Sequence, residues 1–306
     1  MNIFQSVLYK DCQNRKNEEK MSKPNDKPWI SPRAKREIKS WILIILIALG
    51  IKQTIVASYH VPTGSMENTI MTGDFLFGNN FIYGSRTPDW IGIPYTRIGF
   101  KVPWFRLPSI KKPEQGDVVI FKFPLDQHVH YVKRCIAGPG QTIEVKHKQV
   151  FVDDVEFPNP EHSKFTRPTT YSEYWENYQI FPKGSGNEDN FGPVYVPKEG
   201  DTLRLGEYPT QLLKNVVELA NHSFYVQDGK LVIDEIPRDY YVVEQDHYFM
   251  MGDNRDNSYD SRFWGFVPYN LVVGRAIIVW LSINKEMPLY RFPKIVRWNR
   301  FGKIIS

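Results

Sequence analysis

The chain has 306 residues, with 39 Lys and Arg against 34 Asp and Glu, which gives a formal net charge of +5 at pH 7. Because 42% of the residues are hydrophobic and 14% are aromatic, the composition argues against disorder over most of the chain. The small charge excess gives no support for nucleic-acid binding, and two cysteines exclude a disulfide-built scaffold. Cys12 and Cys135 lack the spacing of zinc ligands, so we expect neither a metal nor a cofactor.

An apolar segment follows a charged leader. Residues 1–37 are charged and polar and predict a flexible tail, whereas residues 41–51 (WILIILIALGI) are all apolar or glycine. We expect residues 38–58 to form one transmembrane helix, close to the lower length limit for a span. Ten Lys and Arg lie in the first 40 residues and none between Gln53 and Ser85, an asymmetry that predicts a cytoplasmic N-terminus and a domain beyond the membrane.

Two other interpretations of this segment stay open. One is a helix that is buried in the core or lies at the membrane interface, and the other is a cleaved secretory signal. The leader is long for the charged region of such a signal, and cleavage after Ala57 would place Ile55 where a small residue is required. We therefore expect an uncleaved signal-anchor.

Many short β-like runs, separated by Pro, Gly and aromatic residues, follow the apolar segment. Residues 117–123 are rich in β-branched and aromatic side chains, residues 141–157 alternate strands with polar turns, and residues 274–283 predict a buried strand. Helical periodicity is weak, apart from residues 209–219. We predict a mostly-β fold: an antiparallel β core anchored by one N-terminal transmembrane helix, with a β-rich inserted second domain.

Changes in composition along the chain predict six segments. Residues 158–240 are more polar than their flanks, so we expect them to form an insertion outside the core. The six segments are the tail 1–37, the anchor 38–58, the first part of the core 59–157, the insertion 158–240, the second part of the core 241–284, and a basic-aromatic C-terminal segment 285–306. The C-terminal segment either lies on the outer leaflet as an amphipathic element or packs on the domain, and both alternatives stay open.

Two short motifs contain side chains suited to nucleophilic catalysis. Ser65 follows Gly64 in residues 60–66 (HVPTGSM), and a serine in such a context is usually only part of a turn. Lys133 lies in a β-like run, where a lysine is usually solvated. If Lys133 is desolvated, its pKa falls and it becomes a general base, and Ser-Lys pairs are a known way to activate a serine hydroxyl.

A third motif, residues 251–268 (MGDNRDNSYDSRFWGFVP), is dense in Asp, Asn, Arg and Ser. A solvated loop gains nothing from Trp264 and Phe266, so the polar residues are expected in a buried turn that satisfies its own donors and acceptors. The residues available for internal pairing are Asp253, Asp256, Asp260, Arg255 and Arg262.

Histidine chemistry is the alternative. None of the seven histidines has a context that indicates an activated imidazole, which argues against a Ser-His-Asp site. His128 and His130 share one strand face near Asp126, as metal ligands would, but no further ligand cluster accompanies them.

Together, these blocks resemble the type I signal peptidases (leader peptidases) of bacteria, which are membrane-bound Ser/Lys proteases. The resemblance rests on PTGSM, MTGDFLFGNNFIYG, GDVVIFKFP with HYVKR and GPG, and MGDNRDNSYDSRFWGFVP with GRA, in the family's order. It covers residues 60–145 and 248–278, whereas residues 158–240 and both tails match nothing. Two departures are Ala137 before Gly138-Pro139-Gly140, and the lack of the cysteine pair of some members, so that packing alone must hold the insertion.

The resemblance implies a role for each matching residue. Ser65 corresponds to the nucleophile and Lys133 to the general base, and the Thr63 hydroxyl and the Ser65 amide to the oxyanion-hole donors. Ser258 would orient the lysine, Asp260 and Arg262 would support the site, and Asp253 and Arg134 would form a second pair. The residues expected at the substrate cleft are Val61, Pro62, Met66, Tyr131 and Val132.

The implied activity is removal of signal peptides from secretory preproteins, after small residues of an Ala-x-Ala-like end. The implied location is the bacterial inner membrane, with lipid as a second partner, a single span and the catalytic domain on the outer face. We expect a monomer. Alternatives are a self-cleaving repressor, whose DNA-binding module the short leader cannot hold, a pilin-processing or organelle inner-membrane peptidase, and a non-catalytic membrane-tethered β domain that binds exported chains.

Overall fold

The computed structural model describes residues 31–54, 56–92 and 98–306. The chain divides into two compact units, Met1–Gly50 and Ile51–Ser306. Helix α2 (Pro32–Thr54) begins after Ser31, whose Oγ accepts a hydrogen bond from the Ala34 amide as helix-capping serines do. Within the described ranges, we find no helix whose length and apolar character together suffice for a membrane span, and the span over 38–58 stays a prediction.

The strands of the larger unit are short, as the sequence predicts. They are β1 (Val56–His60), β2 (Asp74–Asn79), β3 (Trp90–Gly92), β4 (Gly99–Lys101), β5 (Val118–Phe123), β6 (Asp126–Ala137), β7 (Thr142–Lys146), β8 (Gln149–Val152), β9 (Val155–Phe157), β10 (Phe191–Tyr195), β11 (Thr202–Arg204), β12 (Phe224–Gln227), β13 (Lys230–Ile233), β14 (Ile236–Arg238), β15 (Tyr240–Val242), β16 (His247–Met251), β17 (Val267–Pro268) and β18 (Val272–Ser282). The helices are α3 (Thr210–Leu219), α4 (Ser261–Trp264) and the 3₁₀ turns η1 (Arg255–Asn257), η2 (Tyr269–Leu271), η3 (Leu289–Arg291) and η4 (Trp298–Arg300). The mostly-β prediction is confirmed, as is the helix expected near residues 209–219.

A seven-stranded antiparallel sheet, in the order β1-β2-β18-β5-β6-β16-β17, forms the first core. Both of its faces are covered, which explains the uninterrupted apolar run of β5. Val118 and Ile120 belong to one apolar cluster, whereas Val119 and Phe121 belong to another. Lys133 is paired with Val119 in the β5–β6 register, so it lies on a face that is covered by apolar side chains rather than by water.

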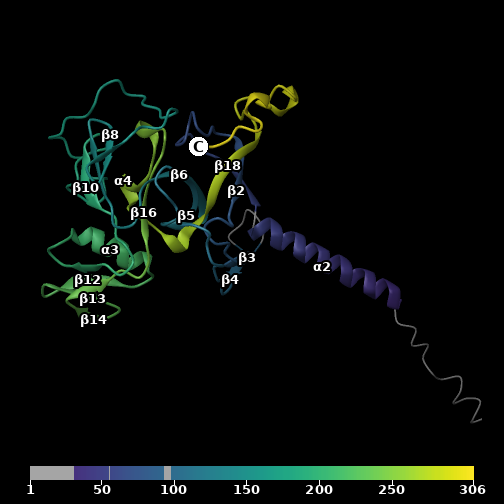
Figure 1. The fold of residues 1–306 in the computed structure, drawn as a ribbon, viewed down its shortest axis with the longest axis horizontal. Helices are drawn as coiled ribbons and strands as arrows, with labels where there is room; N and C mark the ends of the chain where they lie inside the picture. The colour runs from purple at the N-terminus through teal and green to yellow at the C-terminus, as the bar shows by residue number, and fades with distance from the viewer. Residues whose placement is uncertain (1–30, 55, 93–97) are drawn as a thin grey trace, which may run out of the picture. The chain divides into compact units, whose positions relative to one another are not determined.

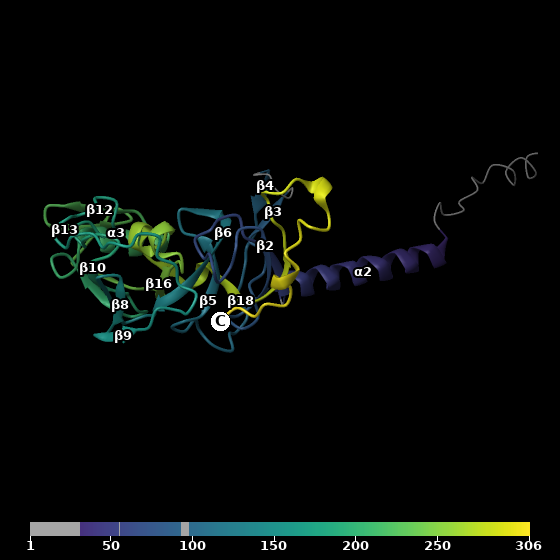
Figure 2. The same cartoon turned by 90° about the horizontal axis from the view of Figure 1, so that it is seen from above.

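A second apolar core surrounds a four-stranded sheet, in the order β10-β7-β8-β9. It contains Ile143 and Val150 from this sheet and Leu213 and Val217 from α3, and it continues into the first sheet through Phe249 of β16. In Figures 1 and 2, β16 lies between β18 and the elements α3, β10 and β12 to β14. β7 pairs with β10, β8 with β7 and β9 with β8, so this sheet joins strands from both sides of residue 158, and the insertion boundary at that residue stays a prediction.

The C-terminal segment 285–306 packs on the first sheet. Isolated bridges join Ile278 to Ile304 and Ile283 to Val296, and the Arg300 guanidinium binds the buried carboxylate of Asp74 with an Nη2–Oδ2 distance of 2.6 Å. These contacts favour the packing alternative for the segment. It nevertheless exposes several large side chains, namely Tyr290, Phe292, Trp298, Phe301 and Ile304.

Candidate active site

A turn after β1 holds Ser65. The Val61 amide donates to the Asp74 carbonyl at 2.9 Å, and the Val61 carbonyl accepts from the Gly73 amide at 2.9 Å, which fixes the chain where β1 ends. Met66 is fully buried in the apolar cluster beside Ile70 and anchors the other side of the turn. Ser65 itself is half-buried between these two fixed points. The turn between buried Val61 and buried Met66 therefore presents the serine at the surface of the core.

The segment after β16 closes over the same turn. The Asn254 amide donates to the Ser65 carbonyl at 3.1 Å, and Asn254 Nδ2 donates to the Gly64 carbonyl at 3.0 Å. A side chain at Gly252 would place its Cβ 2.4 Å from the Ser65 carbonyl oxygen and 2.2 Å from Ser258 Oγ. Only glycine allows this close approach. The sequence did not predict a role for Gly252 or Asn254, because each acts through a contact with residues that lie about 190 positions earlier in the chain.

Lys133 is buried with a neutral partner. Its side chain is 2% exposed, and Nζ donates a hydrogen bond to Ser258 Oγ at 3.1 Å. Burial lowers the pKa of Lys133 from 10.5 to about 8, and the Arg262 charge acts in the same direction, whereas Asp260 and Asp253 oppose it. About a tenth of the amine is therefore neutral at pH 7, and the neutral amine is the form that can accept a proton.

Ser65 and Lys133 line one cavity of about 360 Å³. The five residues predicted at the substrate cleft also line it, together with Thr63 and Gly64. Its remaining walls are His60, His130, Asn257 and Tyr259, which the sequence analysis did not assign to the site. The structure thus brings together residues from β1, β6 and the segment after β16 that are far apart in the sequence.

Asp260 and Arg262 form a buried ion pair beneath Ser258. Arg262 Nε and Nη2 donate to the two Asp260 oxygens at 2.9 Å each, and neither side chain is more than 2% exposed. Burial raises the pKa of Asp260, but the Arg262 guanidinium outweighs this effect and the net pKa lies below the ordinary value. Arg262 Nη1 also donates to the Glu188 carbonyl at 3.0 Å, which ties residues of the predicted insertion to the site.

Arg134 and Asp253 form the second pair. Arg134 Nε and Nη2 donate to the Asp253 oxygens at 2.9 and 2.8 Å, and Thr69 Oγ1 donates to the same carboxylate at 2.6 Å. The pair joins β6, which carries Lys133, to the segment that covers Ser65. The Arg134–Asp253 pair therefore holds the segment after β16 against β6, next to the cavity.

The predicted internal pairing of residues 251–268 is only partly correct. The Asp260–Arg262 pair lies within the segment, but Asp253 pairs with Arg134 of β6. Asp256 accepts from Lys148 Nζ and Arg167 Nη2, each at 3.1 Å, instead of from its own neighbours. Arg255 is buried, and its Nε and Nη2 have no hydrogen-bond partner among the described residues. The turn is satisfied mainly by charges from other elements.

Two histidines lie in the wall of the cavity, next to aromatic rings. The ring of His130 is 5.6 Å from that of Tyr59, and the ring of His60 is 4.9 Å from that of Phe75. His130 keeps an exposed surface, but desolvation by the groups around its ring lowers its pKa, and the nearby Lys122 and Arg86 add to this effect. Both imidazoles are alternative bases for Ser65 that an experiment must separate from Lys133.

A family model described as "Signal peptidase, peptidase S26" matches residues 34–281. The chain is 31% identical to the signal peptidase I of Rickettsia felis over 303 residues, which covers 92% of this chain and 96% of that protein. It is 29% identical to the signal peptidase I of Buchnera aphidicola subsp. Acyrthosiphon pisum over 298 residues, which covers 94% and 86%. A crystal structure of a signal peptidase I from Enterococcus faecalis V583 matches with a TM-score of 0.31 and 21% identity, over 55% of this chain and 98% of that chain, a likeness too low to bear on the fold.

Proposed function

The chain belongs to the S26 signal peptidase family, whose members are serine endopeptidases that remove signal peptides, and on that premise we propose that Ser65 is the nucleophile and Lys133 the general base. The observation that carries the proposal is the state of Lys133. It is almost fully buried, it shares a cavity with Ser65, and its pKa of about 8 leaves part of the amine neutral at pH 7.

Neutral Lys133 takes the proton of Ser65 Oγ while that oxygen attacks the carbonyl carbon of the scissile bond. The negative charge that develops on the carbonyl oxygen is stabilised by the Ser65 amide and the Thr63 hydroxyl, each contributing about 3 kcal/mol. Protonated Lys133 then gives its proton to the leaving amine, and an acyl-enzyme remains. Lys133 next accepts a proton from water, which hydrolyses the ester, and returns that proton to Ser65.

The surrounding groups act by positioning the base. Ser258 accepts from Lys133 Nζ at 3.1 Å and thereby limits its rotation. The Asp260–Arg262 pair presents both charges close to Lys133, but they act in opposite directions on its pKa, so desolvation decides the result. Lowering the pKa from 10.5 to about 8 costs about 3 kcal/mol. The two buried ion pairs stabilise the structure around Lys133, which offsets this free-energy cost.

We propose that the substrate is a preprotein held in an extended conformation, cut after small residues of an Ala-x-Ala-like end. Val61, Met66 and Val132 supply apolar walls that favour small apolar side chains by excluding large ones. β16 pairs with β6 only at residues 134–137. Among the described strands, none pairs with this edge of β6 at residues 128–133, so a substrate strand can pair there. Pairing along an open strand edge orients a peptide without requiring a particular sequence.

We further propose that residues 38–58 anchor the chain in the inner membrane, with the N-terminus in the cytoplasm and Ser65 on the outer face. The excess of Lys and Arg before residue 41 supports this orientation. A short link between the anchor and Ser65 would keep the nucleophile near the surface where signal peptides emerge, which raises its effective concentration.

The test is cleavage of a purified preprotein by the full chain in a non-ionic detergent, with mass spectrometry of both products to locate the cut. Ser65→Ala removes the attacking oxygen and should abolish cleavage, whereas Ser109→Ala, at an exposed serine outside the cavity, should leave it unchanged. His130→Gln and His60→Gln test the alternative bases. Retained cleavage in Ser65→Ala, or its loss in a histidine variant that is folded, would refute the assignment.

A further inference from the structure

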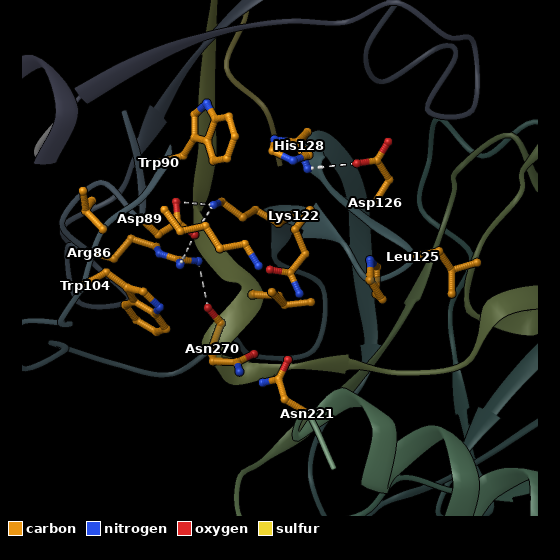
Figure 3. Close-up of a pocket in the computed structure, with 15 residues that line it drawn as sticks. Arg86, Asp89, Trp90, Trp104, Lys122, Leu125, Asp126, His128, Asn221 and Asn270 are labelled. Atoms are coloured by element: carbon orange, nitrogen blue, oxygen red, sulfur yellow. Dashed lines mark hydrogen bonds and ion pairs between the residues drawn. The ribbon is translucent and has the colours of Figure 1, made fainter. Parts of the chain in front are cut away.

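We propose that a second cavity, of about 500 Å³ and separate from the one that holds Ser65, binds a phosphate ester group. Its walls come from Trp90 of β3, the β5–β6 turn and the residues around Asn270 (Figure 3), and Lys101 of β4 also lines it. The inference concerns a binding site and does not depend on the proposed catalytic roles.

The cavity contains more buried positive than negative charge. The side chains of Arg86 and Lys122 are only 8% and 12% exposed, and both point to one carboxylate, that of Asp89 (Figure 3). Arg86 Nη2 donates to Asp89 Oδ2 at 2.9 Å, and Lys122 Nζ contacts both Asp89 oxygens. One carboxylate cannot neutralise two cations. Lys101 adds a third cation at the rim of the cavity, and Asp126 adds a second carboxylate, so the cations in the lining still outnumber the carboxylates. An anionic ligand would complete the charge balance.

Two buried polar atoms of the cavity residues lack hydrogen-bond partners among the described residues. They are Nε of Arg86, a donor, and Oδ1 of Asn270, an acceptor. Arg86 is 9% exposed, and its other contacts are to Asp89 and the Asn270 carbonyl, at 2.9 Å each. Buried polar atoms are rarely left unpaired. A phosphate oxygen would accept from the arginine, and a hydroxyl on the ester's alcohol would donate to the asparagine amide.

The rim of the cavity is aromatic and apolar. Trp104 lies against the Arg86 guanidinium, with 4.1 Å between the guanidinium carbon and the ring centroid, and Trp90 packs edge-on against His128 (Figure 3). Ile98, Phe100 and Phe105, on the adjoining β4 region, are each more than 60% exposed. Tryptophans beside exposed apolar side chains suit the boundary between lipid headgroups and acyl chains. The source of phosphate that this rim favours is therefore a phospholipid.

A third cavity, of about 300 Å³, has lining residues in common with both of the other cavities. It shares Arg86, Asp89 and Lys122 with the phosphate cavity, and it shares His130 with the cavity that holds Ser65. A phospholipid bound at Lys122 would thus hold the membrane surface at a fixed position relative to Ser65.

The experiment is isothermal titration calorimetry of the full chain in a non-ionic detergent. The ligands are short-chain dihexanoyl phosphatidylglycerol, inorganic phosphate and uncharged dihexanoylglycerol. We expect the phosphatidylglycerol to bind, and Lys122→Gln to weaken that binding by about tenfold or more, because a charged hydrogen bond is lost. Lys101→Gln, at an exposed position that does not risk folding, should weaken it to a smaller extent. Lys230→Gln removes the same charge from β13, outside the cavity, and should have no effect.

Binding of inorganic phosphate with the same dependence on Lys122 would support the site and identify a free phosphate compound as its source. Binding of phosphatidylglycerol without inorganic phosphate would support a lipid source. The proposal would be overturned if no phosphate ligand binds, if uncharged dihexanoylglycerol binds equally well, or if Lys122→Gln and Lys101→Gln behave like Lys230→Gln.

Discussion

Two largely buried lysines, Lys133 in the seven-stranded sheet and Lys148 beside the four-stranded sheet, have different partners. Among the described residues, the hydrogen bond of Lys133 Nζ goes to a hydroxyl, that of Ser258. Lys148, in the β7–β8 turn, is 12% exposed and contacts the Asp256 carboxylate at 3.1 Å and the Arg167 carbonyl at 3.0 Å. A carboxylate in contact with an amine keeps it charged, whereas burial without one favours the neutral amine. Desolvation, with no carboxylate in direct contact to oppose it, is thus what lowers the pKa of Lys133 and makes it available as a base.

The largest expected effect is on kcat/KM, because only one of the two lysines is proposed to act as a base. Lys133→Arg keeps a positive charge but cannot lose its proton at ordinary pH, so kcat/KM for preprotein cleavage should fall by at least about 10⁴-fold. Lys148→Arg keeps its ion pair with Asp256 and should change kcat/KM by less than about threefold. An active Lys133→Arg variant, with its fold verified by circular dichroism, would show that the base is another group.

The close approach at Gly252 gives the next largest effect. Gly252→Ala would force Ser258 and the Ser65 carbonyl apart, because the new Cβ would lie within 2.4 Å of both. We expect kcat/KM to fall by about 100-fold, since small displacements of catalytic groups cost that much. Gly138→Ala is the control, because its Cβ would meet only Gln141 Oε1 at 3.5 Å. Equal activities of the two variants would contradict the proposed positioning.

Stability should respond in opposite directions at the two lysines. Folding lowers the pKa of Lys133, so below about pH 8 the folded state bears the cost of burying its charge or removing its proton. Lys133→Met should therefore raise the free energy of unfolding by about 1–3 kcal/mol at pH 7, a gain that fades as the pH rises from about 8 to 10.5. Lys148→Met should lower it by about 1–3 kcal/mol, because the buried Asp256 loses a partner. Urea unfolding measures both, and changes of the same sign would refute the comparison.

The pH dependence of cleavage is the smallest effect and the most direct measure of Lys133. Only the neutral amine accepts a proton, so log kcat/KM should rise with pH at unit slope and level off above about pH 8. The rate at pH 7 should be about tenfold below the plateau. A profile that stays flat down to about pH 5 would contradict a lysine base in any position.

The sequence alone determined the class of the fold and the residues with suitable chemistry. The alternation of β-branched runs with Gly and Pro turns is local, so it predicted the strands of β5, β7 to β9 and β18 without knowledge of their partners. The sequence did not predict which strands pair in the second sheet, because strand pairing is non-local. β7 pairs with β10 across a stretch of irregular chain, and no residue near 142 signals this.

Only the tertiary structure decided the electrostatic character of the site. Nothing around residue 133 distinguishes a solvated lysine from a buried one, since burial depends on the apolar cover that Val119 and its neighbours provide from other strands. The same holds for Asp253, whose partner Arg134 lies 119 residues away, and for Gly252, which is required by a contact with Ser65. Propensity is a property of neighbours in sequence, whereas desolvation and charge pairing are properties of neighbours in space.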